Sequence, residues 1–148
     1  MNDISYFNII LSDDDVDDCL FFKDALAELP LITTLTIVND GEQLMRYLET
    51  VTDDLPHVIF LDINMPRKNG FECLTEIKKH SVLKTLPVIM YSTSYDEDKA
   101  KLLYNTGAHY FLCKPSDFKK LKNLIHKAIM LVKENVEQPF KENFYINK

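Results

Sequence analysis

Hydrophobic residues gather in five short runs along the chain, and longer segments of mixed character separate these runs. Each run is bounded by proline or by polar and charged residues, which is typical of a strand buried on both faces of a parallel sheet. The second run is short and alternating, so we expect it at an edge of the sheet. We predict strands at residues 7–12, 35–38, 58–61, 87–91 and 110–113.

The segments between the runs carry apolar residues at helical spacing. After the first run, apolar residues recur at steps of three and four and form one face of a helix, with members Cys19, Phe22, Leu26 and Leu29. A helical segment also follows each of the other four runs. Strands that alternate with helices form a parallel sheet with right-handed crossovers and helices on both faces. The pattern therefore predicts an α/β fold with five strands and five helices.

Composition favours a soluble single-domain protein. With 148 residues and 46% hydrophobic content, the chain is long enough for one substantial core. A net charge of -6 argues against a nucleic-acid partner, and no apolar stretch approaches the roughly 18 residues that span a membrane. Its three cysteines are widely spaced among apolar residues, which favours buried thiols in a reducing compartment. We therefore expect a cytoplasmic protein.

Polar side chains follow four of the predicted strands directly. They are Asp13 and Asp14 after the first strand, Asp62 after the third, Ser92 after the fourth and Lys114 after the fifth. The carboxyl ends of parallel strands meet at one edge of the sheet, where open α/β folds bind their ligands. Three carboxylates there repel one another unless a cation joins them, so loss of Asp13 or Asp14 should stabilise the metal-free protein. Oxygen ligands with room for water suit Mg²⁺, and such a site can transfer a phosphoryl group to a carboxylate.

Two of these features also have simpler interpretations. Asp62 by itself could merely cap the helix that follows it. Its place among the other polar residues at strand ends favours a reactive role instead. The alternate aspartates of residues 13–17 have the spacing of calcium-loop ligands. That loop needs Gly at its sixth position and Glu at its twelfth, where this chain has Asp18 and Asp24, so a calcium loop is excluded.

Beyond the last predicted helix, residues 134–148 form a tail whose aromatic residues are Phe140, Phe144 and Tyr145. A chain end of this kind is often poorly ordered unless contacts hold it to the domain. Three alternatives stay open for the tail: it docks a partner, it frays, or it folds back onto the domain.

The order and spacing of these motifs resemble those of the response-regulator receiver domain. The matching stretches are residues 9–15, 39–42, 61–70, 87–92, 107–108 and 111–115. The resemblance covers residues 5–133 and leaves residues 134–148 as a C-terminal tail. It implies a flavodoxin-like, doubly wound sheet in the order 2-1-3-4-5 with five helices.

The resemblance also implies a metal-dependent phosphorylation site. Asp62 would accept the phosphoryl group at the end of the third strand. Asp14 would ligate Mg²⁺ directly and Asp13 through water, while Asp62 and the backbone carbonyl of Asn64 complete the protein ligands; Mn²⁺ could replace Mg²⁺. The family has two acids where this chain has three, so Asp14 with Asp15 stays open as the ligand pair. We prefer Asp13 with Asp14 because they follow the strand directly.

Further positions concern how the phosphoryl group is held and how its signal leaves the site. Ser92 and Lys114 would bind the phosphoryl oxygens. Ser92 would also couple to Phe111, which stands at the switch-aromatic position of the family. The ring of Phe111 would then turn inward and change the surface formed by the helix near residues 96–106, the fifth strand and the last helix. The family has a cis peptide where this chain has Lys114–Pro115, and it usually has an aliphatic residue in place of Ser12.

We therefore expect a stand-alone response regulator. It would accept a phosphoryl group onto Asp62 from a histidine kinase or a phosphotransfer protein and signal to a downstream protein target. It would phosphorylate and dephosphorylate itself without an output enzyme domain, as a monomer or weak dimer that binds neither nucleic acid nor membrane. The alternatives are an aspartate-nucleophile phosphohydrolase, with Asp13 or Asp15 as nucleophile, and an interaction module that works without phosphorylation.

Overall fold

The computed structural model describes residues 6–147, in which strands alternate with helices as predicted. The strands are β1 (Tyr6–Ser12), β2 (Ile32–Val38), β3 (Val58–Asp62), β4 (Val88–Ser92) and β5 (Tyr110–Cys113). The helices are α1 (Val16–Ala27), α2 (Gly41–Thr50), α3 (Gly70–Lys79), α4 (Glu97–Thr106) and α5 (Phe118–Glu134), with two short 3₁₀ turns, η1 (Leu83–Thr85) and η2 (Lys141–Asn143). The largest difference from the predicted bounds is in β2, which begins before the predicted residue 35.

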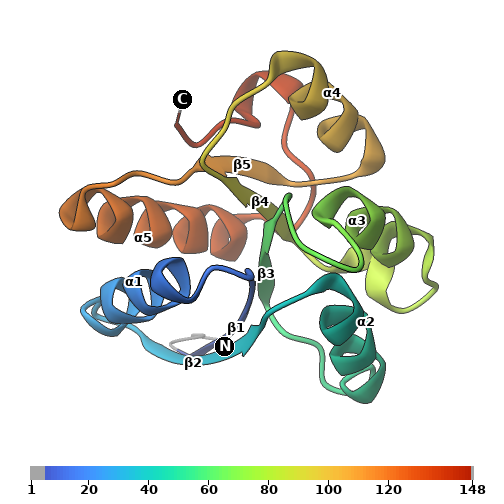
Figure 1. Ribbon diagram of the computed structural model, residues 1–148, viewed down its shortest axis with the longest axis horizontal. Coiled ribbons are helices and arrows are strands. Elements are labelled where there is room, and N and C mark those ends of the chain that lie inside the picture. Colours follow the sequence, from blue (N-terminus) through green and yellow to red (C-terminus); the bar gives the residue numbers. More distant parts are fainter. Residues whose placement is uncertain (1–5, 148) are drawn as a thin grey trace.

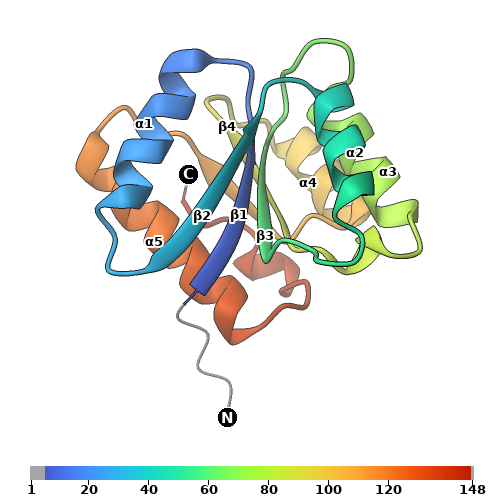
Figure 2. The same ribbon diagram turned by 90° about the horizontal axis from the view of Figure 1, so that it is seen from below.

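The five strands form one parallel sheet in the order β2-β1-β3-β4-β5, which confirms the predicted doubly wound fold. Helices α1 and α5 cover one face, and α2, α3 and α4 cover the other (Figures 1 and 2). All residues of β3 are buried. Val58 and Phe60 pack on the α1/α5 side, whereas Ile59 and Leu61 pack on the opposite side. Burial on both faces explains why this strand is a continuous apolar run.

Polar residues next to the strand ends start the helices. Asp15 is the N-cap of α1, and its carboxylate accepts a hydrogen bond from Asp18 N–H at 3.0 Å. Asn69 caps α3 in a reciprocal capping box. A Cβ atom at Gly70 would lie 2.3 Å from the carbonyl oxygen of Asp62. Only glycine therefore lets α3 begin this close to the end of β3.

The three cysteines are thiols without a disulfide, as expected. Cys19 and Cys73 are buried, and Cys113 is half-buried. Burial raises the pKa of Cys19 to about 11 and that of Cys73 to about 12, so both are poor nucleophiles and act in packing. Within residues 6–147, no helix combines the length and the apolar character that a membrane span requires.

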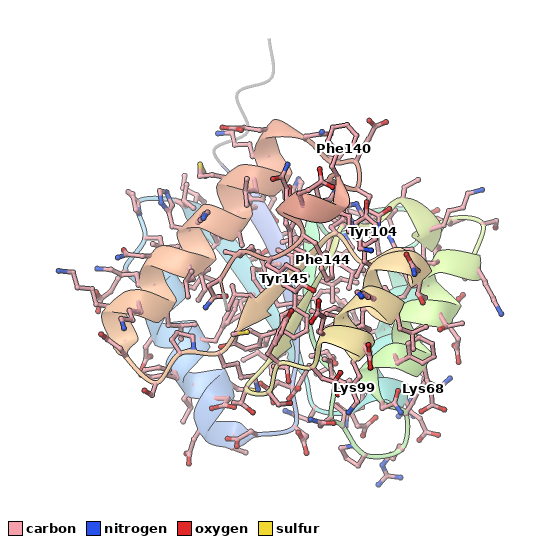
Figure 3. All side chains as sticks on the ribbon, turned by 90° about the horizontal axis from the view of Figure 1, so that it is seen from above. Lys68, Lys99, Tyr104, Phe140, Phe144 and Tyr145 are labelled. Carbon is pink, nitrogen blue, oxygen red and sulfur yellow. The ribbon has the colours of Figure 1, made fainter. Side chains whose placement is uncertain are left out.

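After α5 the chain turns back, and residues 135–147, here called the C-terminal segment, lie beside the outer edge of β5 (Figures 1 and 3). A parallel bridge pairs Phe111 of β5 with Tyr145 of the segment. Phe144 and Ile146 are buried, whereas Phe140 is 79% exposed. Of the three alternatives for the tail, folding back onto the domain is confirmed.

Candidate functional site

The carboxyl ends of the strands bring the predicted acids and the predicted lysine together. Carboxylate oxygens of Asp13, Asp14 and Asp62 all lie within 4.8 Å of one another. Lys114 Nζ lies 2.8 Å from Asp13 Oδ2 and 3.2 Å from Asp62 Oδ2. The backbone N–H of Lys114 donates to the carbonyl oxygen of Ser92 at 2.8 Å, which fixes the lysine to the end of β4. The site thus combines three acids, of which Asp13 and Asp62 are buried and Asp14 is exposed, with the ammonium of Lys114.

Lys114 has a third carboxylate partner that the sequence pattern did not reveal. Asp18 Oδ2 lies 2.9 Å from Lys114 Nζ. The side chain of Asp18 is 35% exposed, whereas that of Lys114 is 7% exposed and its ammonium lies 4.8 Å from the ring centroid of Tyr91. Asp18 belongs to the first turn of α1, and side chains of a helix lean toward its N-terminus. Because the N-terminus of α1 lies at the strand ends, this orientation of helical side chains could have indicated that Asp18 points toward Lys114.

The combined effect of burial and charge raises the pKa of both Asp62 and Lys114, but for different reasons. Burial raises the pKa of Asp62 from 3.8 to about 7; Lys114 opposes the increase, and Asp13 adds to it. For Lys114, burial lowers the pKa, but the hydrogen bonds to Asp13 and Asp18 and the charge of Asp62 outweigh it and raise the pKa above its usual value. The lysine is therefore cationic and offsets part of the negative charge. The remaining acids attract a further cation.

The donor set of the cluster is suited to a hard divalent cation. Asp13 is fully buried, and its Oδ1 accepts a hydrogen bond from Asp15 N–H at 3.0 Å. Asp62 Oδ1 accepts one from Asn64 N–H at 3.2 Å. Asp14 is exposed, so the cluster is open to solvent on its side. Three carboxylates with room for water fit Mg²⁺ or Mn²⁺, whereas Asp15 is engaged as the cap of α1.

The two serines near the site bond to neighbouring residues and not to the acid cluster. Ser92 Oγ accepts a hydrogen bond from Ser94 N–H at 3.3 Å and lies 3.5 Å from Ser94 Oγ. Ser12 is fully buried, and its hydroxyl donates to Met65 Sδ at 3.1 Å. This bond explains how a polar residue is accommodated where the family usually has an aliphatic one.

Two further predicted positions lie beyond the acid cluster. Phe111 is 1% exposed, and its ring lies 6.1 Å from that of Tyr95 and 6.3 Å from those of Phe144 and Tyr145 in the C-terminal segment. The expected cis peptide at Lys114–Pro115 is wrong, since the bond is trans. Trans is the isomer that X–Pro bonds favour by about 0.5–1 kcal/mol.

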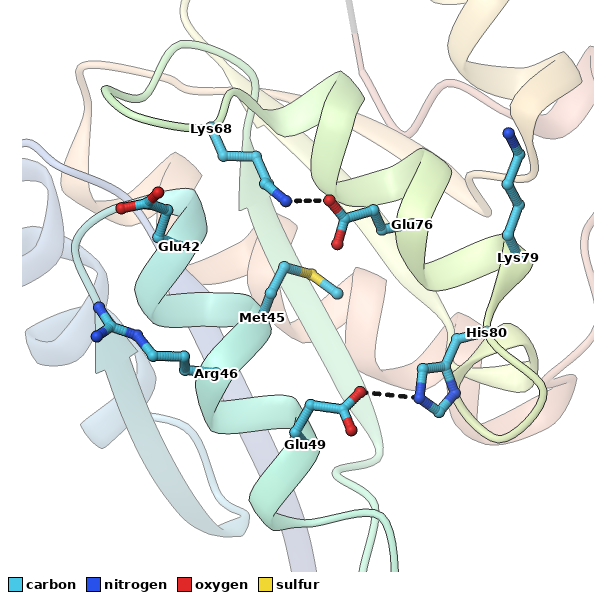
Figure 4. A pocket seen from close by; sticks show the side chains of 8 residues that line it. All are labelled: Glu42, Met45, Arg46, Glu49, Lys68, Glu76, Lys79 and His80. Atoms are coloured by element: carbon cyan, nitrogen blue, oxygen red, sulfur yellow. Dashed lines mark hydrogen bonds and ion pairs between the residues drawn. The ribbon is translucent and has the colours of Figure 1, made fainter.

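A groove of about 660 Å³ lies between α2 and α3, and none of the strand-end residues lines it (Figure 4). Two pairs of its polar groups interact: Lys68 with Glu76 on the α3 side, and His80 with Glu49 across the groove at 2.9 Å. The full lining consists of Glu42, Met45, Arg46, Glu49, Lys68, Glu76, Lys79 and His80. Because the groove contains neither the strand-end acids nor Lys114, the strand-end cluster is the better candidate site.

The sequence profile described as the response regulator receiver domain matches residues 9–126 of this chain. The chain therefore belongs to the receiver-domain family of response regulators. This membership confirms the family that the motifs resembled, and it sets aside the phosphohydrolase alternative.

Individual relatives agree with this assignment. Response regulator Rcp1 of Synechocystis sp. is 30% identical over 135 residues, a match that spans 88% of this chain and 92% of Rcp1. Among solved structures, the phosphorylated cyanobacterial phytochrome response regulator RcpA matches with a TM-score of 0.80 and 28% identity, over 90% of this chain and 99% of RcpA. The Mn²⁺-bound form of Rcp1 matches with a TM-score of 0.76 and 29% identity, over 90% of this chain and 99% of Rcp1.

Proposed function

We propose that this receiver domain is a phosphoryl-accepting switch of a two-component system. Asp62 receives the phosphoryl group from the phosphohistidine of a histidine kinase or a phosphotransfer protein. The observation that carries the proposal is the contact of Lys114 Nζ with both Asp62 and Asp13 at the end of the sheet. An ammonium and further acids around a buried carboxylate suit a phosphoryl group accompanied by a divalent cation. The phosphorylated structure of RcpA supports this assignment.

The acid cluster is the proposed site of Mg²⁺ or Mn²⁺, and the Mn²⁺-bound structure of Rcp1 supports it. Asp14 would be a direct ligand because its carboxylate is exposed next to the other two. Asp13 would act through water, since its Oδ2 already bonds to Lys114. The Asp62 carboxylate and the backbone carbonyl of Asn64 would complete the protein ligands. When bound, the ion neutralises charge on the transferring phosphoryl oxygens.

Side chains of the chain itself carry out the transfer. A carboxylate oxygen of Asp62 attacks phosphorus while the phosphorus–nitrogen bond of the donor breaks, which leaves an acyl phosphate on Asp62 and imidazole on the donor. Lys114 Nζ, 3.2 Å from Asp62 Oδ2, stays within reach of the new phosphoryl oxygens and offsets their charge. The hydroxyl of Ser92 leaves Ser94 and donates to a phosphoryl oxygen.

The signal would leave the site through the movement of Ser92 and a change of the surface formed by α4, β5 and α5, where a downstream protein target binds. Hydrolysis of the acyl phosphate would end the signal. Residues 5–133 would be the receiver domain and residues 134–148 its C-terminal tail. The protein would act in the cytoplasm as a monomer or weak dimer, without nucleic acid or membrane.

Incubation with acetyl phosphate and Mg²⁺, followed by intact-mass measurement, tests this function. Wild type should gain one phosphoryl group, Asp62→Asn should gain none, and EDTA should abolish the gain. Asp53→Asn, which changes an exposed acid, should be labelled like wild type. Labelling that persists in Asp62→Asn but disappears in Asp13→Asn would place the nucleophile elsewhere. Wild type that accepts no phosphoryl group from any donor would favour a phosphorylation-independent interaction module.

A further inference from the structure

The C-terminal segment completes the sheet at the outer edge of β5. Phe111 N–H donates to Phe144 O, and Ile146 N–H donates to Phe111 O, both at 2.9 Å. Asn147 continues this pairing with its side chain, since its Oδ1 accepts from Cys113 N–H at 2.9 Å and its Nδ2 donates to Cys113 O at 3.0 Å. The segment therefore satisfies the outward-facing peptide groups of β5 as an additional strand would.

Two side chains of the segment are buried where it pairs with β5. Phe144 is 1% exposed and packs against Tyr104 of α4, with ring centroids 5.3 Å apart (Figure 3). Ile146 is 7% exposed and joins the core on the α1/α5 side. Phe144 has helical backbone angles, φ -65° and ψ -38°, so the extended pairing is centred on Tyr145, and Phe144 and Ile146 on either side of it are buried on opposite faces of the sheet. Backbone pairing at a sheet edge with pockets for the flanking side chains is how such an edge recognises a peptide. The edge of β5 thus has the features of a peptide-binding surface, and the chain fills it with its own residues.

Contacts with α4 hold the first half of the segment. Gln138 Nε2 donates to the carbonyl oxygen of Tyr104 at 2.7 Å, and the hydroxyl of Tyr104 donates to Pro139 O, also at 2.7 Å. His109 Nε2 donates to Val136 O at 2.9 Å. These contacts tie the segment to α4 and to the start of β5, and the ring of Tyr145, 5.4 Å from that of Tyr95, ties it to the loop that leads into α4.

A short series of contacts connects this loop with the candidate site. Ser92 Oγ accepts a hydrogen bond from Ser94 N–H, and the next residue, Tyr95, packs its ring 6.1 Å from Phe111 and 5.4 Å from Tyr145. For Ser92 to reach a phosphoryl oxygen its side chain must turn, which would move Oγ away from Ser94 N–H and release the loop that carries Tyr95. The docking of the segment and the binding of a phosphoryl group by Ser92 would thus both act on this loop.

We infer that the edge of β5 is a binding surface for an extended strand of a partner protein, and that the C-terminal segment occupies this surface until Asp62 is phosphorylated. The inference rests on the proposed function, because the phosphoryl group causes the release. After release, β5 presents unpaired peptide groups at Phe111 and Cys113 next to the hollow vacated by Phe144. The partner strand has the chemistry of the present occupant: an aromatic and an aliphatic side chain two residues apart, followed by an amide side chain.

Release and phosphorylation are coupled reciprocally. If a phosphoryl group weakens the docking of the segment by some factor, loosening the segment must strengthen the binding of a phosphoryl mimic by the same factor. Couplings of this kind span about 5- to 150-fold, and we expect about tenfold tighter binding of beryllofluoride by Phe144→Ala. Phe140→Ala is the matched control, because Phe140 is the exposed aromatic side chain of the same segment. It should bind beryllofluoride like wild type.

Amide hydrogen exchange on the full chain tests the release. With beryllofluoride and Mg²⁺, the amides of Phe111 and Cys113 should exchange about tenfold faster, because their acceptors belong to the segment. The amide of Ile59, which donates to Pro87 O inside the sheet, should not change. Fluorine resonances report separately whether beryllofluoride is bound. Bound beryllofluoride with unchanged protection of Phe111 and Cys113 would overturn the inference and leave the proposed function intact.

A synthetic peptide of residues 140–147 tests the surface independently of phosphorylation. It should bind Phe144→Ala without beryllofluoride and wild type only with it. A control peptide with aspartate in place of Phe144 and Ile146 should bind neither protein. Absence of peptide binding to Phe144→Ala would overturn the proposed surface, even if beryllofluoride does not bind Asp62 at all. A dimer detected by light scattering upon beryllofluoride binding would make a second copy the occupant and overturn the assignment to a partner strand.

Discussion

Replacing Asp62 by asparagine should stabilise the protein when no divalent cation is present. The residue is 6% exposed, and burial raises its pKa from 3.8 to about 7. A carboxyl group that binds its proton more tightly in the folded state costs stability once it is ionised. Asparagine has nearly the same shape and no charge, so Asp62→Asn lacks this cost.

The magnitude of the stabilisation follows from the two pKa values. The difference between 3.8 and about 7 corresponds to at most about 4 kcal/mol at a pH above both values. The gain should be absent below pH 3.8, grow as the pH rises toward 7 and remain constant above that pH. At pH 8, about 4 kcal/mol would raise the unfolding midpoint by about 8–16 °C for a domain of this size. Saturating Mg²⁺ should remove most of the difference, because it pairs with the ionised carboxylate of wild type.

Thermal unfolding in EDTA, followed by circular dichroism from pH 4 to pH 8, measures the effect. Asp53→Asn provides the control, since Asp53 is exposed and its replacement should cause no such rise with pH. A stabilisation by Asp62→Asn that is constant over this pH range would refute the reasoning from burial. A stabilisation that persists in saturating Mg²⁺ would refute the place of Asp62 in the cation site.

Three further predictions concern the neighbours of Asp62 and the C-terminal segment. Asp13→Asn should lower the free energy of unfolding by about 3 kcal/mol in urea titrations, because it removes a carboxylate 2.8 Å from the buried ammonium of Lys114. Asp18→Asn removes a half-exposed partner of the same lysine and should lower it by about 1 kcal/mol. Equal effects of the two variants would contradict this order. Burial lowers the pKa of His109 to about 4, so wild type should lose at most about 3 kcal/mol of stability as the pH falls from 6.5 toward 4. His109→Gln should lose much less over the same pH range. Identical pH profiles of the two proteins would exclude His109 as the cause. Asp14→Ala should weaken Mg²⁺ binding by about tenfold or more in calorimetry. Asp15→Asn keeps the cap of α1 and should bind Mg²⁺ like wild type. Equal losses of affinity would indicate that Asp14 and Asp15 are the ligand pair.

The sheet and the position of the acid cluster could be predicted because both follow from local patterns. A short apolar run with Asp62 at its end defines a buried strand and its reactive edge. Parallel pairing places the ends of β1 and β3 next to each other and the end of β5 beyond β4, a gap that the long side chain of Lys114 spans. The convergence of Asp13, Asp14 and Lys114 on Asp62 is a consequence of that topology.

The partners of Lys114 could not be predicted in the same way. Repulsion among the acids alone suggested that loss of Asp13 would stabilise the metal-free protein. The 2.8 Å bond from Lys114 Nζ to Asp13 Oδ2 changes this expectation, because the lysine already joins the acids as a cation. The bond from Lys114 to Asp18 also depends on how α1 packs on the sheet beside α5, which no pattern within α1 or β5 contains.

The docking position of the C-terminal segment could not be predicted from the sequence either. Its pairing with β5 involves so few residues that no alternation of apolar and polar positions marks a strand. Phe140 and Phe144 are both aromatic, yet one is exposed and the other is buried. The difference arises from the hollow beside Tyr104 on α4, which exists only after the domain has folded.

The identity of the phosphorylated residue tests the central claim most directly. Wild-type protein is treated with acetyl phosphate and Mg²⁺, reduced with borohydride to convert aspartyl phosphate into homoserine, digested and sequenced by mass spectrometry. We predict conversion at Asp62 and at no other residue, and no conversion when hydroxylamine is added before borohydride. Conversion at Asp13 or Asp15, or a stable phosphate on a histidine or serine, would contradict the assignment of Asp62 as the phosphoacceptor.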